Sequence, residues 1–287
     1  MAQTRVLQRR IRSVKNAKQI TKALEVVAAA RMRRIVELVA GSRAYGELAT
    51  AIMQHIAPSP EARVHSFFAP LTDKPTLYIV ITSDRGQAGA YNSNIFNLAL
   101  DSFKADKHRP EVVVLGRKGA RYFAHLAGIN LRGAYEDIAD NPDPNVFAPV
   151  LELIRQETTN GAIGRVTIIY TQFISSLSQK AMAFQLMPID LSVVEASGEP
   201  QRVYEFEPEV GEVLDEAIKL YSQAKLMQSK IESAASEHAM RMVAMGNANR
   251  NASDLIDGLT LELNATRQAA ITQEIAEITG GAAAIAG

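Results

Sequence analysis

Two long stretches without proline, one at each end of the chain, constrain its fold most strongly. The first covers residues 1–57 and the second residues 209–287. Proline breaks a helix because it lacks an N–H group and clashes with the preceding turn, so its absence permits long continuous helices. At ~1.5 Å of rise per residue, the second stretch would form a rod of roughly 110 Å. Helices of globular domains average about 11–12 residues, so we expect a shaft here rather than ordinary core helices.

Both stretches carry apolar residues at alternating spacings of three and four. Sustained over many turns, this spacing is typical of a coiled-coil seam. The predicted seam positions in the first stretch are Leu7, Ile11, Val14, Lys18, Thr21, Leu24, Ala28, Arg31, Ile35, Leu38, Ser42, Tyr45, Ala49, Ile52 and Ile56. The predicted positions in the second are Val210, Leu214, Ala217, Tyr221, Ala224, Gln228, Ile231, Ala235, His238, Met242, Met245, Asn249, Ala252, Ile256, Leu259, Leu263, Thr266 and Ala270.

If these two helices pair, they must run antiparallel, because one enters the region between them and the other leaves it. The expected register brings Ile56 close to Val210 and Arg5 close to Glu262. About twenty-five C-terminal residues then continue past the N-terminus as a single helix of ~35–40 Å. This helix ends in small, uncharged residues at 280–287. Polar seam residues usually fix register, and we interpret His238 and Asn249 in this way.

Between the helical stretches, strand and helix patterns alternate. The predicted strands are Thr76–Thr82, Glu111–Leu115, Arg165–Phe173 and Lys180–Met187, and the predicted helices are about Asn94–Lys104, Lys118–Ala127 and Asn145–Glu157. Such alternation predicts a parallel or mixed sheet with helices on both faces. Only residues 174–179 separate the last two strands, which indicates an antiparallel hairpin, and residues 191–208 are expected to form a linker.

The expected fold class is therefore α/β, with two parts. A long antiparallel coiled coil is formed by an N-terminal helix (residues 1–57) and a C-terminal helix (residues 209–287). A Rossmann-like α/β domain (residues 75–190) lies between them in the sequence.

Composition narrows the classes of function. Of the 287 residues, 47% are hydrophobic and 22% are charged, and the formal net charge is zero, which is ordinary for a globular protein. The chain contains no cysteine, which excludes disulfides and thiolate metal sites. It has no run of apolar residues long enough to predict a membrane-spanning helix.

Positive charge is concentrated in the N-terminal helix, where residues 1–34 contain ten Lys and Arg residues and one acidic residue, Glu25. Such a helix suits nucleic acid, an anionic membrane or an acidic protein. No aromatic residue precedes Tyr45, which disfavours base stacking. The apolar face is committed to helix pairing, which disfavours membrane binding. We expect an acidic protein partner, with a merely solvated basic face as the alternative. The arginines assigned to this contact are Arg9, Arg12, Arg31 and Arg34.

Two glycine-containing turns follow predicted strands, where an α/β domain can hold a phosphate group. They span Ser83–Asn92 and Leu115–Gly119, and neither has the lysine–hydroxyl pair or the three-glycine spacing of a nucleotide site. We interpret them as turns that need the backbone freedom of glycine. The five histidines are scattered, and no serine has the context of a nucleophile. We therefore expect no catalytic, cofactor-binding or metal-binding residues.

Three blocks of the sequence together resemble one protein family, the gamma subunits of F-type ATP synthase. The resemblance covers the whole chain, and its first and last blocks are the most specific. The matching segments are Ile11–Asn16, Ile20–Met32, Ser83–Gly86, Gly89–Asn92, Arg241–Met245, Arg267–Ile275 and Gly281–Ala284.

This resemblance implies a rotor rather than an enzyme. Gamma subunits form the central shaft of the complex, and their coiled coil penetrates a ring of alternating alpha and beta subunits. Their α/β domain contacts the epsilon subunit and the c-ring of the membrane sector. Ion flow turns the c-ring and the shaft, which drives the beta subunits through their nucleotide-binding states, and ATP hydrolysis drives the reverse rotation. The resemblance implies no cofactor and no nucleic acid partner, and the membrane is contacted only through the complex.

Contact residues are also implied by the matching motifs. Arg267, Gln268 and Thr272 match positions that latch the shaft against the ring. Leu24 and Arg241 match the region that faces the loops of the beta subunits, although plain seam packing is the alternative for Leu24.

The chain departs from the family pattern in ways that suggest its origin. It has Ala88 where members often have a cysteine, and it lacks the regulatory cysteine-bearing insertion of chloroplast members. Its N-terminus begins Met-Ala and enters the helix directly, which favours a bacterial member, located peripherally at the cytoplasmic face of the plasma membrane. Two other functions are considered, a nucleotide-binding α/β enzyme with coiled-coil arms and a coiled-coil adaptor for acidic proteins.

Overall fold

The computed structural model describes residues 2–56, 59–60, 62, 65, 67–68, 73–189 and 210–286. The expected linker at residues 191–208 lies outside these ranges, as do the side chains of the expected tip from residue 281 onward. The chain divides into two compact units. We call residues 1–28 with 241–287 the helix-pair unit, and residues 29–240 the sheet unit. Each is described separately below.

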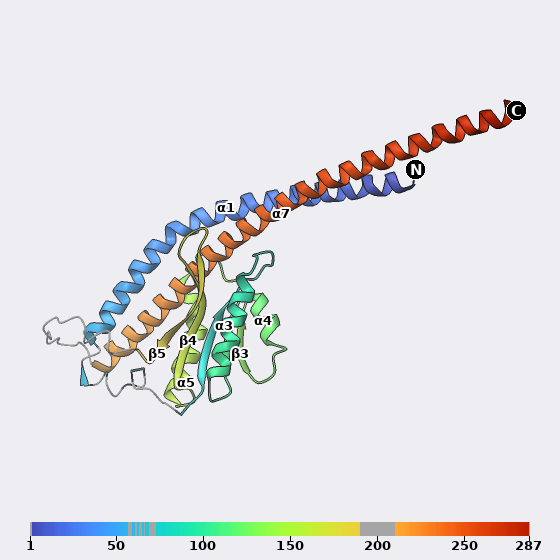
Figure 1. Cartoon of the computed structure of the whole chain (residues 1–287). Helices are drawn as coiled ribbons and strands as arrows, with labels where there is room; N and C mark the ends of the chain where they lie inside the picture. Colours follow the sequence, from blue (N-terminus) through green and yellow to red (C-terminus); the bar gives the residue numbers. More distant parts are fainter. Residues whose placement is uncertain are drawn as a thin grey trace. The chain divides into compact units, whose positions relative to one another are not determined.

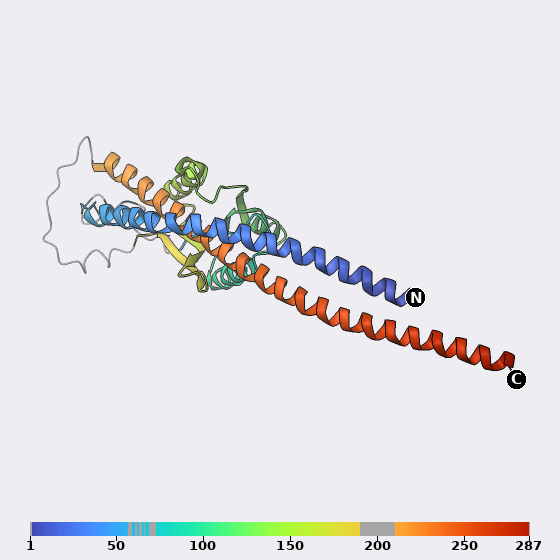
Figure 2. The same cartoon turned by 90° about the horizontal axis from the view of Figure 1, so that it is seen from above.

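Two helices account for both proline-free stretches and confirm the prediction of continuous helices. Helix α1 spans Ala2–Ile56, and helix α7 spans Val210–Ala286, which makes it 77 residues long. At ~1.5 Å per residue, α7 is about 115 Å long. Within the helix-pair unit, α7 continues past the beginning of α1, as expected from the predicted register (Figures 1 and 2).

The sheet unit contains a five-stranded sheet in the order β3-β2-β1-β4-β5. Its strands are β1 (Thr76–Ile81), β2 (Glu111–Leu115), β3 (Asn130–Tyr135), β4 (Arg165–Phe173) and β5 (Gln179–Met187). The first four strands are parallel, and β5 pairs antiparallel with β4. The Rossmann-like order and the predicted hairpin are therefore both confirmed.

Helices cover both faces of the sheet, because alternate residues of its central strands point to opposite sides. On one face, Tyr78 and Val80 of β1 pack with α3 (Tyr91–Ala105) and α4 (Arg117–Phe123). On the other face, Leu77 and Ile79 pack with α5 (Ala148–Thr159) and with the nearby ends of α1 and α7. A short 3-10 helix, η1 (Pro144–Phe147), precedes α5. Figure 1 shows α3, α4 and α5 around the strands.

Strand β3 was not predicted, and the ends of three helices differ from the prediction. Strand β3 lies at the edge of the sheet and is only partly buried, so Asn130–Tyr135 carries no apolar run that would reveal it. Helix α3 begins three residues before the predicted Asn94, and α4 ends at Phe123 rather than Ala127. Helix α5 begins at Ala148 rather than at Asn145.

The seam predicted for α1 is correct in the helix-pair unit and one residue out of phase at two later positions. From Leu7 to Ala28, every predicted position is buried or partly buried. In the sheet unit, by contrast, Arg31 and Tyr45 are exposed, and the neighbours Met32 and Gly46 are the shielded residues. An α-helix has 3.6 residues per turn, so a strict repeat of 3.5 drifts around its surface. Residues 29–56 of α1 belong to the sheet unit, and their buried face follows the natural helical period.

Candidate functional site: exposed helix faces and a buried polar clamp

The residues assigned to partner contacts differ in exposure. Leu24 is partly buried, and Arg241 is 9% exposed and has an interaction within the chain. The others are exposed on α1 and α7, namely Arg9, Arg12, Arg31, Arg34, Arg267, Gln268 and Thr272. The basic side chains of α1 thus point away from the protein, as a contact with an external partner requires.

A hydrogen bond joins the two helices of the helix-pair unit. The side-chain amide of Asn249 donates to the backbone carbonyl of Lys18 over 3.1 Å. In the expected antiparallel register, residues 18 and 249 lie opposite each other whenever Arg5 lies opposite Glu262. This bond supports the interpretation of Asn249 as a register-fixing residue.

The end of α7 presents apolar side chains to solvent. All residues from 271 to 280 are exposed, and Ile271, Ile275 and Ile278 among them are 47%, 57% and 72% exposed. Their spacing of four and then three places them on one helical face. This stripe was missed because the predicted seam ends at Ala270, yet its spacing is readable in the sequence.

The middle of α7 shows the opposite arrangement, because residues 229–239 are all buried although many are polar. Buried polar groups need hydrogen-bond partners, so each must be matched by the surrounding structure. The buried polar and charged members of this segment are Ser229, Lys230, Glu232, Ser233, Ser236, Glu237 and His238.

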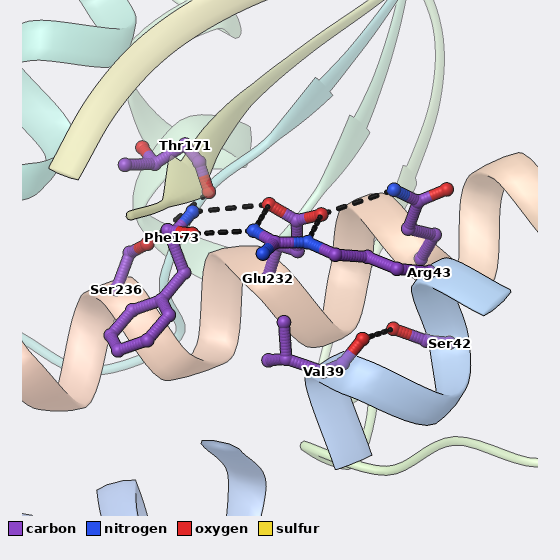
Figure 3. Close-up of polar contacts among 8 residues, drawn as sticks. Val39, Ser42, Arg43, Thr171, Phe173, Glu232 and Ser236 are labelled. Atoms are coloured by element: carbon purple, nitrogen blue, oxygen red, sulfur yellow. Dashed lines mark hydrogen bonds and ion pairs between the residues drawn. The ribbon is translucent and has the colours of Figure 1, made fainter. Parts of the chain in front are cut away.

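Glu232 forms the centre of a polar cluster that joins three elements (Figure 3). Its side chain is fully buried, and its two oxygens accept hydrogen bonds from Nε and Nη2 of Arg43 on α1, each over 3.0 Å. The same Glu232 oxygen that binds Nη2 also accepts the backbone N–H of Phe173 in β4, over 3.1 Å. Arg43 Nη2 donates in turn to the Phe173 carbonyl. The hydrogen bond to Glu232 raises the pKa of Arg43 above its ordinary value.

Two serines of α7 extend this cluster along β4. Ser233 Oγ accepts the backbone N–H of Thr171 over 3.3 Å, and Ser236 Oγ donates to the carbonyl of the same residue over 3.3 Å. We call the side chains of Arg43, Glu232, Ser233 and Ser236, together with the backbone of Thr171 and Phe173, the strand-end clamp.

The clamp exists because β1 is shorter than β4. The last residue pair between these strands joins Val80 to Ile169. After it, the N–H of Thr82 donates a hydrogen bond to the carbonyl of Leu115 in β2 rather than to β4. Residues 171–173 of β4 therefore have a strand neighbour on the β5 side only. Unpaired backbone groups are costly when buried. Side chains of α1 and α7 supply the partners that a longer β1 would have supplied.

His238 has a different role from the one expected. Its Nε2 donates to Asp140 Oδ2 over 2.9 Å, which ties α7 to the segment between β3 and η1. Burial alone would raise the pKa of Asp140. The hydrogen bond from His238, with the charges of His238, Lys230 and Arg31, outweighs burial and lowers this pKa below its ordinary value.

The glycine turns at the carboxyl ends of the strands are closed by the chain itself. At the beginning of α4, the N–H groups of Arg117, Lys118 and Gly119 donate to three successive residues after β1. The acceptors are Asp84 Oδ1, the Ser83 carbonyl and Thr82 Oγ1, at 2.9–3.0 Å. A phosphate would need these same N–H groups. For the second turn, the structure thus supports the interpretation as a turn rather than as a phosphate cradle.

Glycine is required in the second of these turns. Gly116 has a φ of +113°, and a Cβ atom at this position would lie 2.3 Å from the Thr82 carbonyl oxygen. Both the backbone conformation and the available space therefore exclude other residues.

The described residues contain neither a group of side chains suited to a metal ion nor a helix long and apolar enough to cross a membrane.

Comparison with known proteins identifies the family. A family model described as ATP synthase matches residues 3–285. The ATP synthase gamma chain of Pelotomaculum thermopropionicum is 37% identical over 286 residues, which cover 99% of this chain and all of that protein. The gamma chain of Legionella pneumophila is 36% identical over 289 residues, with the same coverage.

Solved structures agree on the fold. The rotor of the Euglena gracilis mitochondrial ATP synthase contains a chain that matches with a TM-score of 0.67 and 19% identity, over 94% of this chain and 99% of that one. A second structure of the enzyme from the same organism matches with a TM-score of 0.70 and 21% identity, over 99% and 95% of the two chains. With a family model that spans nearly every residue and bacterial relatives that align end to end, the chain belongs to the ATP synthase gamma chain family.

Proposed function

We propose that this protein is the central rotor shaft of an F-type ATP synthase. It couples ion-driven rotation of the c-ring to ATP synthesis or hydrolysis on a ring of alpha and beta subunits, and it is not itself catalytic. The observation that carries this proposal is the end-to-end similarity to bacterial gamma chains. The turn at the beginning of α4 agrees with it, because the N–H groups that could hold a phosphate there are bonded within the chain.

The exposed end of α7 suits a bearing inside a ring. An isolated helix with Ile271, Ile275 and Ile278 facing solvent has apolar area that a partner can cover. Apolar contacts are not directional, so a helix seated in an apolar sleeve can turn without breaking specific bonds. This property distinguishes a rotor from a coiled-coil adaptor, which needs a fixed contact.

The contact residues remain a proposal in two groups. Arg267, Gln268 and Thr272 are exposed on α7 and would latch the shaft to the ring. Arg9, Arg12, Arg31 and Arg34, with Leu24 and Arg241, would face acidic loops of the beta subunits. Opposite charges attract over a Debye length of about 8 Å at physiological salt. Each acidic loop would therefore be attracted to the basic face when the shaft turns that face towards it.

The sheet unit would make the remaining contacts of the rotor. We infer that it binds the epsilon subunit and the c-ring, and that the membrane is contacted only through the complex, at the cytoplasmic face of a bacterial plasma membrane. In this scheme residues 1–57 and 209–287 work as the shaft, and residues 75–190 work as its foot. Three beta subunits would meet three different faces of the shaft, which biases each towards a different nucleotide-binding state.

Reconstitution tests the proposed function directly. The purified chain is mixed with alpha and beta subunits from the same source and analysed by size-exclusion chromatography with light scattering, and ATPase activity is assayed on the eluted peak. We expect one copy of the chain per alpha/beta hexamer and a higher ATPase activity than that of the hexamer alone. A hexamer that is competent in ATP binding and yet forms no complex would overturn the proposal.

The latch is tested by simultaneous alanine substitution of Arg267, Gln268 and Thr272 in the same complex. We expect the dissociation constant of the shaft from the ring to rise about tenfold, because a few interface residues carry much of the binding energy. Alanine substitution of Lys104 and Lys107, which are exposed on the sheet unit, is the control. Equal retention of both variants would argue against the latch.

A further inference from the structure

We propose that the strand-end clamp is the joint through which torque passes between the sheet and the two long helices. This inference rests on the proposed function, because a shaft that turns under load must not slip relative to its foot. The clamp lies wholly inside the sheet unit, where Arg43 of α1, Glu232 of α7 and Phe173 of β4 meet.

The bonding pattern of the clamp resists motion in more than one direction. Arg43 holds Glu232 through two parallel hydrogen bonds, and such bidentate pairs fix orientation as well as distance. Both side chains also bind the Phe173 backbone, one its carbonyl and the other its N–H. Sliding or rotation of either helix against β4 would therefore break several directional bonds at once.

The apolar surroundings of the clamp cannot provide this resistance alone. In the neighbouring core, α7 presents Ala234, Ala235 and Ala239 to larger apolar side chains such as Ile35 and Val39 of α1. Alanine surfaces allow close approach but interlock little, and apolar attraction has no preferred direction. The polar clamp is the element in this region that defines one relative position of helix and strand.

Backbone groups make the joint rigid on the side of the sheet. The N–H and C=O groups of Thr171 and Phe173 belong to a strand that is paired with β5 from Val166 to Phe173. They cannot rotate as side chains do. The helices are thus held to the backbone of the sheet through groups that keep a fixed orientation.

The experiment measures the torsional stiffness of the joint in the assembled alpha/beta ring with this chain. The chain has no cysteine, so Lys107→Cys gives it a single thiol on the exposed surface of the sheet unit, to which a bead is attached. The ring is immobilised and arrested with a non-hydrolysable ATP analogue. The angular variance of the bead is then recorded, since a softer joint gives a larger variance at the same temperature.

Two variants of the clamp are compared with one matched control. Glu232→Gln removes the charge and one acceptor of the buried pair, and the combined change Ser233→Ala with Ser236→Ala removes only the bonds to Thr171. The control is Glu152→Gln, which breaks an exposed pair with Arg155 on α5. We expect the angular variance to increase about threefold in Glu232→Gln and less in the serine variant, a range typical of energetic coupling through packed networks.

The outcomes separate this inference from the proposed function. Free rotation of the bead with ATP in the unmodified complex supports the shaft, and its absence would reject the shaft. Suppose that the unmodified complex rotates and that both clamp variants show the same angular variance as the unmodified chain. The proposal that the clamp transmits torque would then be overturned. If Glu232→Gln does not assemble, the serine variant decides. A lower melting temperature with unchanged variance would show a role in stability alone, and would also overturn the proposal.

Discussion

Two segments of helix α7 show opposite relations between chemistry and environment. Residues 229–239 are buried on every side for about three turns and contain charged and hydroxyl side chains. Residues 271–280 are exposed on every side and present Ile271, Ile275 and Ile278 to water. In the first segment the chain supplies all the partners itself, and in the second an external surface has to supply them.

This contrast shows how burial separates internal joints from external contacts in a shaft. Polar residues are used where one fixed position is needed, because hydrogen bonds are directional. Apolar residues are used where contact must persist during movement, because the hydrophobic effect has no preferred direction. The two segments therefore predict different responses to the same kind of substitution.

The largest effect is expected from Glu232→Ala. It leaves the buried N–H of Phe173 without its acceptor, whereas Arg43 is 38% exposed and can turn to water, so the loss of unfolding free energy should be about 1–3 kcal/mol. Urea unfolding of the full chain, followed by tyrosine fluorescence, measures this loss. Glu152→Ala at an exposed pair should leave the midpoint unchanged. A midpoint for Glu232→Ala equal to that of the unmodified chain would break the comparison.

Ile275→Lys should act in the opposite way. The isolated chain should unfold at the same urea concentration as before, because Ile275 is exposed. Affinity for the alpha/beta ring should fall about 10- to 100-fold, since a charge replaces an apolar contact at an interface. Binding is measured by titration of labelled chain into the hexamer, with Lys107→Glu as the control. Equal affinities of the two variants would remove the reason to regard this segment as a bearing.

A smaller effect is expected within the helix pair from Asn249→Ala. The change removes one hydrogen bond to the Lys18 carbonyl and should cost about 0.5–1.5 kcal/mol of local stability. Amide hydrogen exchange of α1 around Lys18 measures this change. Asn247→Ala is the matched control, because Asn247 is exposed and bonds only within α7 among the contacts seen. The interpretation of Asn249 as a register residue requires faster exchange in the first variant alone.

The smallest effect is expected from Asp140→Asn, and it depends on pH. The pKa of Asp140 lies below its ordinary value of 3.8, so its ionised form stabilises the folded state. This contribution is present above pH 3.8 and is lost as the pH falls through the lower folded-state pKa. Melting temperatures from pH 7 to pH 3 should therefore show a deficit of the variant at neutral pH that narrows in acid. A constant deficit would mean that the charge of Asp140 contributes nothing.

Much of the fold could be predicted from local patterns. Apolar runs located β1, β2, β4 and β5 within one residue, and the absence of proline located α1 and α7. Strand β3 was missed because an edge strand such as Asn130–Tyr135 buries only part of its surface and carries a mixed sequence. Local patterns therefore found the elements whose burial is strong and periodic.

The strand-end clamp could not be predicted, because its parts are far apart in the sequence. Arg43, Phe173 and Glu232 become neighbours only after the sheet and both helices have formed. Nothing next to Glu232 in the sequence indicates that its partner is a backbone N–H group left free by the early end of β1. His238 was assigned to helix pairing for the same reason, since Asp140 is distant in sequence. The proposed contact residues depend on family resemblance and await the experiments above.

The early end of β1 has a consequence for how this protein can change over time. Two more residues of strand would give Thr171 and Phe173 ordinary neighbours, and Glu232 would then be a buried acid bound only by the side chains of Arg43 and Gln228. A lineage that lengthened this strand would have to lose the acid, and one that lost the acid would gain from a longer strand. Strand length and the residue at position 232 should therefore vary together among relatives, as a single inherited trait.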